Sequence, residues 1–90
     1  MINKTIRLNV PNGLHLRVAG EICSITKNSD SEVILSCEEC PNKTAEGCSV
    51  IQMLMLEAAC GKNIGVSING KDEERVMRKI EEVFTDGNGI

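Results

Sequence analysis

Aromatic side chains are almost missing from this sequence, which has one Phe and neither Trp nor Tyr. Basic residues are also in the minority, because 10 Lys and Arg stand against 13 Asp and Glu for a formal net charge of -3. Proteins that bind nucleic acid usually present a basic face, and those that bind single strands add aromatic platforms for base stacking. The composition therefore argues against nucleic acid as a partner.

Long apolar runs are missing as well. No stretch reaches the length of a membrane-spanning helix, and the N-terminus lacks the charged, apolar and small-residue order of a signal peptide. We therefore expect a cytoplasmic protein that is not bound to a membrane. Five cysteines are an odd number and fall short of a disulfide scaffold, so most are expected to be free thiols.

Alternation of apolar and polar residues predicts four strands in the 90 residues. They are expected over residues 2–10, 32–36, 44–47 and 63–68, with the turn CEECPNK joining the second to the third. Apolar residues at helical spacing predict helices that begin at Leu16 and end before KNSDS, and that span residues 49–59 and 71–84. Ser49 followed three residues later by Gln52 is typical of the capping box that begins a helix.

This element order predicts an α+β fold with one core. Helices that fall between mainly antiparallel strands favour an open-faced β-sandwich, in which a four-stranded sheet is covered on one face by three helices. The second helix is apolar almost all the way round, so it is either unusually buried or partly exposed for docking. We expect a single monomeric domain over residues 1–84 and a flexible C-terminal tail over residues 85–90.

His15 is the only histidine, and it lies in NGLHLRVAG, at the corner between the first strand and the first helix. Such a residue lies beside the unpaired N–H groups of the first helical turn, here those of Leu16, Arg17 and Val18, which stabilise an anion together with the helix dipole. The same field favours a neutral, nucleophilic imidazole, while Arg17 can fork onto phosphate oxygens. These residues indicate a phosphate site. In a simpler interpretation, His15 only caps the helix and Arg17 is a solvated charge.

The stretch GLHLRVAG resembles the active-site signature G-[LI]-H-A-R-P-A of HPr, the histidine-containing phosphocarrier family of the bacterial phosphoenolpyruvate-dependent sugar phosphotransferase system (PTS). CSVIQMLMLEAACG is similar to the regulatory-serine helix of that family, commonly K-S-I-M-G-[VL]-[ML]. VSINGKDEERVMRKIEEVF resembles its last strand and helix. The resemblance covers nearly the whole chain apart from a few extra residues around 37–41, and the family has the element order predicted above.

The resemblance implies that His15 takes a phosphoryl group through its Nδ1 from phosphorylated enzyme I and passes it to the IIA domain of a sugar permease. Phosphoryl transfer of this kind needs positioning and charge stabilisation, so no metal or cofactor is implied. The protein would be a phosphoryl carrier with a transient phosphohistidine more than a free-standing enzyme. Both partners are expected to dock on the first helix and on Val50, Ile51 and Leu54, which match the apolar docking patch of the family.

Three positions depart from the family. Val18 stands where the family almost always has proline, and the loss of that proline is expected to loosen the corner. Leu16 stands where alanine is usual, and its bulkier side chain is expected either to shield His15 or to change which partner fits. Cys48 stands where lysine is common, directly ahead of Ser49. The resemblance makes Ser49 a candidate for phosphorylation by HPr kinase/phosphorylase, although a helix N-cap explains the same serine without a kinase.

The cysteines leave three interpretations open. Cys37 and Cys40 form a C-x-x-C, which is a half-site of many metal centres, and Cys48 and Cys60 are the remaining metal-ligand candidates. Cys37 and Cys40 could instead be a redox pair, or all of these residues could be inert thiols. Cys23 lies on the apolar face of the first helix and is expected in the core.

Three functions of different classes follow. The first, which we favour, is a PTS phosphocarrier that works through His15. The second is an HPr-like regulatory binding module that is linked to Ser49 and carries no transport phosphate. The third is a metal or redox adaptor built on the cysteines, with His15 as a helix cap.

Overall fold

The chain alternates strands and helices in the order that the sequence predicts. The computed structural model describes residues 1–9, 13–37, 40–56 and 61–86. Its strands are β1 (Ile2–Arg7), β2 (Ser31–Cys37), β3 (Cys40–Glu46) and β4 (Asn63–Gly70), and its helices are α1 (Leu16–Lys27), α2 (Val50–Met55) and α3 (Glu73–Asp86). None of the helices in the described ranges is long and apolar enough to cross a membrane.

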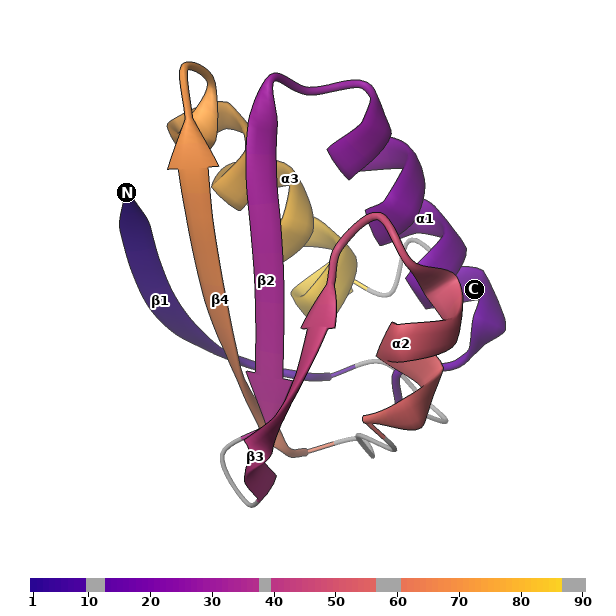
Figure 1. Cartoon of the computed structure of the whole chain (residues 1–90). Coiled ribbons are helices and arrows are strands. Elements are labelled where there is room, and N and C mark those ends of the chain that lie inside the picture. The colour runs from indigo at the N-terminus through magenta and orange to yellow at the C-terminus, as the bar shows by residue number, and fades with distance from the viewer. Residues whose placement is uncertain (10–12, 38–39, 57–60, 87–90) are drawn as a thin grey trace.

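The strands form one sheet in the order β1-β4-β2-β3, and every neighbouring pair is antiparallel. The helices lie on one side of this sheet, and α2 lies beside α1 at the β3 edge (Figure 1). The predicted α+β open-faced sandwich is therefore confirmed.

The apolar residues of neighbouring strands face one another across the ladder. Ile6 pairs with Ile64, Val33 with Ile68 and Leu35 with Val66, and all six side chains are buried. The residues between them are half-buried or exposed, as the alternation of a strand with one wet face requires. This single apolar face is what α1 and α3 cover.

Helix α3 closes the core and also positions the start of α1. Phe84, the one aromatic residue, is fully buried near the end of α3. Its carbonyl oxygen accepts a hydrogen bond of 2.9 Å from the N–H of Asn9, which follows β1. The chain that leads into α1 is thereby tied to the last turn of α3.

The ends of several elements differ from the sequence prediction. β1 ends at Arg7 instead of residue 10, and β3 begins at Cys40, four residues earlier than expected, with a register shift between Ser36 and Cys37. α3 continues through residues 85 and 86, where the sequence predicts a flexible tail, and 87–90 lie outside the described residues. α2 spans six residues of the expected 49–59, of which 57–59 are not described.

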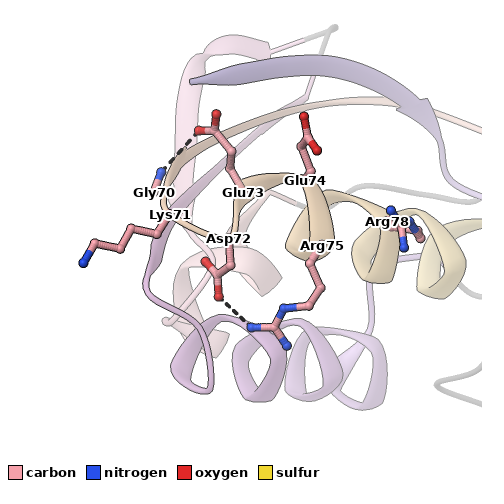
Figure 2. Close-up of a pocket in the computed structure, with 7 residues that line it drawn as sticks. All are labelled: Gly70, Lys71, Asp72, Glu73, Glu74, Arg75 and Arg78. Carbon is pink, nitrogen blue, oxygen red and sulfur yellow. Dashed lines mark hydrogen bonds and ion pairs between the residues drawn. The ribbon is translucent and has the colours of Figure 1, made fainter.

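Asp72 holds the corner between β4 and α3 against the start of β2. Its carboxylate accepts hydrogen bonds from the hydroxyl of Ser31 and from the N–H of Asp30 at 3.1 Å. It also accepts one from the guanidinium of Arg75 at 2.6 Å (Figure 2). The Ser31 hydroxyl, the Asp30 N–H and the Arg75 guanidinium together lower the pKa of Asp72 from 3.8 to about 2. The ionised carboxylate therefore stabilises this corner.

Two glycines near the helices have opposite surroundings. A Cβ built on Gly20, in the middle of α1, would meet nothing within 4 Å. A Cβ on Gly47, in the turn before α2, would lie 2.7 Å from both the Thr26 hydroxyl and the Val33 Cβ. Only glycine fits at position 47 without moving α1 away from β2.

The Asp72 network predicts a loss of stability in acid. Because the pKa is lower in the folded protein, the contribution of this carboxylate is complete above about pH 4 and is lost as the pH falls towards 2. Asp72→Asn and Ser31→Ala should each flatten the fall in unfolding free energy between those pH values, measured by urea denaturation. A parent-like pH dependence in both variants would contradict the role of this network.

The two glycines predict opposite effects of one substitution. Gly20→Ala should raise the unfolding free energy by about 0.5–1 kcal/mol, because alanine restricts the unfolded chain and fits the helix without a clash. Gly47→Ala should lower it by about 1–3 kcal/mol, because the new methyl group overpacks the space between α1 and β2. Chemical denaturation of both variants measures the difference, and effects of the same sign would contradict this account.

Candidate functional site

The corner ahead of α1 is built so that His15 faces outward from a fixed backbone. Gly13 has a φ of 69°, a left-handed conformation that glycine adopts without strain, and its carbonyl oxygen accepts the His15 N–H at 3.0 Å. Leu14 is buried in the core, with 4% of its surface exposed. The buried Leu14 anchors the corner, and the next residue, His15, is half-buried at the surface.

His15 is the N-cap of α1. Its Nδ1 accepts a hydrogen bond of 3.3 Å from the backbone N–H of Arg17, and its carbonyl oxygen accepts the first helical bond, from Ala19, at 2.9 Å. A nitrogen that accepts a hydrogen bond carries no proton, so the proton of the neutral imidazole is on Nε2. His15 therefore caps the helix, and the cap holds the Nδ1 lone pair directly over the start of the helix.

Two more backbone donors lie in the same helical turn as the Arg17 N–H. The N–H groups of Leu16 and Val18 belong to the first turn, which has no intrahelical acceptor, so they remain for a ligand or water. The Val18 side chain is fully buried, the Arg17 side chain is exposed, and the first turn of α1 contains no acidic residue. The structure therefore brings together the imidazole, the guanidinium-bearing residue and the amide groups that the sequence singled out.

An apolar surface adjoins this corner. Helix α1 contacts α2 (Figure 1), and 66% of Leu16, 72% of Ile51 and 37% of Leu54 are exposed. Val50 is half-buried and packs against the core. Met55, which no sequence motif marks, is 66% exposed and extends the surface. We call Leu16, Ile51, Leu54 and Met55 the apolar surface.

Ser49 caps α2, as the sequence predicts, but only half of the capping box forms. The Ser49 hydroxyl accepts the N–H of Gln52 at 3.3 Å. The Gln52 side chain does not return to Ser49 and instead accepts the N–H of Glu46 at 2.9 Å, while the Ser49 N–H donates to the Glu46 carbonyl oxygen at 3.0 Å. Phosphorylation of Ser49 stays a prediction.

Cys37 and Cys48, two of the predicted metal-ligand candidates, do not gather at one site. Cys37 is buried at the end of β2, whereas Gly47, the neighbour of Cys48, hydrogen-bonds to Val33 at 2.7 Å, four residues or about 13 Å back along that strand. Cys60 and the side chain of Cys40 lie outside the described residues. Among those that are described, no group of three or more His, Cys, Asp or Glu could hold a metal ion. Cys37 and Cys48 therefore do not share a site.

A pocket of about 400 Å³ lies away from His15, at the corner between β4 and α3. Two of its acidic side chains bond to neighbouring groups: Asp72 accepts a hydrogen bond from Arg75, and Glu73 accepts the Gly70 N–H at 3.3 Å (Figure 2). Asp72 also binds the N–H of Asp30, just beyond the C-terminal end of α1, whereas His15 begins that helix of 12 residues, about 18 Å away. These residues serve the fold, and His15 lies elsewhere.

Comparisons with known proteins agree over the length of the chain. The family model described as "PTS HPr component phosphorylation site" matches residues 2–86. Phosphocarrier protein NPr of Klebsiella oxytoca is 31% identical over 86 residues, which cover 96% of this chain and 93% of the relative. Phosphocarrier protein HPr of Chlamydia muridarum is 38% identical over 79 residues, which cover 88% of this chain and 73% of the relative.

Solved structures share the fold. HPr from Thermoanaerobacter tengcongensis superposes with a TM-score of 0.88 over 100% of this chain and 98% of that chain, at 22% identity. HPr from Bacillus anthracis superposes with a TM-score of 0.83 over 92% of this chain and 95% of that chain, at 18% identity. Together with the family match over residues 2–86, these findings show that the chain belongs to the HPr family of phosphocarrier proteins of the phosphotransferase system.

Proposed function

We propose that this protein accepts a phosphoryl group from phosphorylated enzyme I on Nδ1 of His15 and passes it to a IIA domain. The observation that carries the proposal is the 3.3 Å hydrogen bond from the Arg17 N–H to Nδ1, which fixes an unprotonated nitrogen at the start of α1. Such a nitrogen is available as a nucleophile, and the site needs no metal ion for the transfer. As in the family, the transfer takes place in the cytoplasm.

The transfer balances around Nδ1. Its lone pair forms the bond to phosphorus while the bond from phosphorus to the donor breaks, and the proton on Nε2 stays in place. The lone pair can then no longer accept from Arg17, so that N–H turns to a phosphoryl oxygen, beside the first-turn donors of Leu16 and Val18. The helix exchanges one cap acceptor for another, which favours a phosphohistidine that can be passed on.

Arg17 supplies the side-chain charge at this site. Its exposed guanidinium follows His15 by two residues and can reach the phosphoryl oxygens or an acidic group of a partner. A guanidinium stabilises the charge that spreads over these oxygens during transfer. Arg17 is thus the proposed catalytic partner of His15.

The apolar surface and the half-buried Val50 are the proposed docking site for enzyme I and the IIA domain. Exposed apolar residues that adjoin a reactive side chain are typical of a protein-binding surface, since burying them drives association. The relatives carry two names, HPr and NPr, so the donor and acceptor in any test should come from the same organism as the carrier.

A regulatory function at Ser49 is the second proposal. Its half-buried hydroxyl lies two residues before Ile51, at the edge of the apolar surface. A phosphate there would keep the favourable field of a helix start, yet would place negative charge where partners dock. HPr kinase/phosphorylase would be the partner for this reaction.

Phosphoenolpyruvate and enzyme I should add one phosphate to the protein, because one imidazole is available. Intact-mass analysis should show this addition, phosphorus NMR should assign it to the Nδ1 position of His15, and acid should remove it. His15→Ala should take up none. Arg17→Ala, which keeps the backbone N–H, should slow transfer by about 10- to 100-fold through loss of a charged hydrogen bond. Normal phosphate uptake by His15→Ala would sink the proposal.

A charge on the apolar surface should weaken docking. Ile51→Lys should raise the KM for this carrier in the enzyme I reaction at least about 10-fold, because a buried hot-spot contact is lost. Its thermal midpoint should stay near that of the parent, since Ile51 is 72% exposed. The control is Asn69→Lys, which adds the same charge to an exposed residue outside the apolar surface, near the C-terminal end of β4. Equal KM values for the two variants would contradict docking through Ile51.

A further inference from the structure

The thiol of Cys23 meets the main chain of Cys48, a distant part of the chain, between α1 and the turn before α2. The Sγ of Cys23, on the buried face of α1, donates to the carbonyl oxygen of Cys48 at 3.4 Å, across 25 residues of sequence. Both residues are free thiols in this structure. Neither participates in the proposed phosphoryl transfer.

The backbone on both sides of Cys48 is fixed against α1 and β2. The Gly47 N–H donates to Val33 at 2.7 Å, and the Ser49 N–H donates to Glu46 at 3.0 Å. Gly47 also fits so closely against Thr26, three residues after Cys23 on α1, that an added Cβ would lie 2.7 Å from its hydroxyl. Cys48 is therefore held within one helical turn of Cys23.

The two thiols differ in access. Cys48 is exposed and lines a groove of about 370 Å³ together with Thr26 and Glu46, whereas Cys23 is buried, with 9% of its surface exposed. The Cys48 thiol lies 3.9 Å from the Glu46 carboxylate. Solvent therefore reaches the Cys48 thiol readily, and the Cys23 thiol hardly at all.

We propose that Cys48 is a modification site for low-molecular-weight disulfides and that Cys23 resolves the adduct to form a Cys23–Cys48 disulfide. The Cys48 thiolate attacks a disulfide RSSR, which gives a mixed disulfide at Cys48 and releases one RS⁻. The Cys23 thiolate then attacks the Cys48 sulfur and releases the second RS⁻. Two protein thiols are oxidised, one external disulfide is reduced to two thiols, and the two protein protons go to water or to the released thiolates.

Closing this bond calls for small movements. Because the Cys23 sulfur already touches the main chain of Cys48, rotation of the Cys48 side chain and a local adjustment of the turn bring the two sulfurs together. Cys37, four residues beyond Val33 on β2, is not in reach. The disulfide would link α1, which carries His15, to the turn that leads into α2, so it goes beyond the carrier function and would couple the two docking helices.

The test uses the full chain with Cys37→Ala, Cys40→Ala and Cys60→Ala, which leaves Cys23 and Cys48 as its two cysteines. The probe is bis(2-hydroxyethyl) disulfide, an uncharged reagent that the Glu46 carboxylate does not repel. We expect intact mass to show a transient adduct of one reagent half, followed by a net loss of about 2 Da, the two thiol hydrogens. Proteolysis without reductant should then yield one peptide pair joined through Cys23 and Cys48.

Two variants in this background separate the steps. Cys23→Ser keeps a hydrogen-bond donor but no sulfur, so the adduct at Cys48 should persist. Cys48→Ser lacks the exposed thiol, so both the adduct and the disulfide should form more slowly than in the parent or not at all. A stable adduct in the parent, or an oxidised product joined between two molecules, would overturn the proposal. If the triple variant does not fold, peptide mapping of the natural chain gives the same decision. Phosphoryl uptake is not a readout, so this test is independent of the proposed carrier function.

Discussion

A sheet with only one apolar face is the constraint on which the molecule depends. Ile6, Val33, Leu35, Ile64 and Val66 point to the same side, and only that side has to be removed from water. The helices gather there, which places the start of α1 beside α2. His15 and the apolar surface are neighbours because both helices cover one sheet.

The N-cap of α1 offers a structural explanation for the proposed phosphoryl transfer at His15. In the free protein the Arg17 N–H is satisfied by Nδ1 of His15, and in the proposed phosphorylated form a phosphoryl oxygen takes its place. The helix start is capped in both forms. A carrier that neither gains nor loses a helix cap on phosphorylation can pass the group on without refolding part of the chain.

Local patterns were enough to predict most of the fold and the position of His15 within it. The position of His15 between alternating and helical residues placed it at the helix start, and the resemblance to HPr agrees with the family now shown. Contacts between distant residues were not predictable. The sequence did not show that Gln52 would bond to Glu46, that Met55 would be exposed, or that Cys23 would meet Cys48. These depend on the angle between elements, which periodicity does not encode.

The close packing of Gly47 fixes the backbone of the turn before α2 independently of the side chains that follow it. Its close approach to Thr26 and Val33 fixes the path of the backbone through a residue that has no side chain. The backbone at positions 48 and 49 therefore follows the same course whatever side chains these residues carry. The side chain at position 48 can therefore change from the lysine that is common in the family to an exposed cysteine while α2 stays in place. A charged group is then replaced by a thiol that can be oxidised. Because Gly47 fixes the backbone, the side chains at positions 48 and 49 can change, and with them the regulation of the protein, without a change of fold.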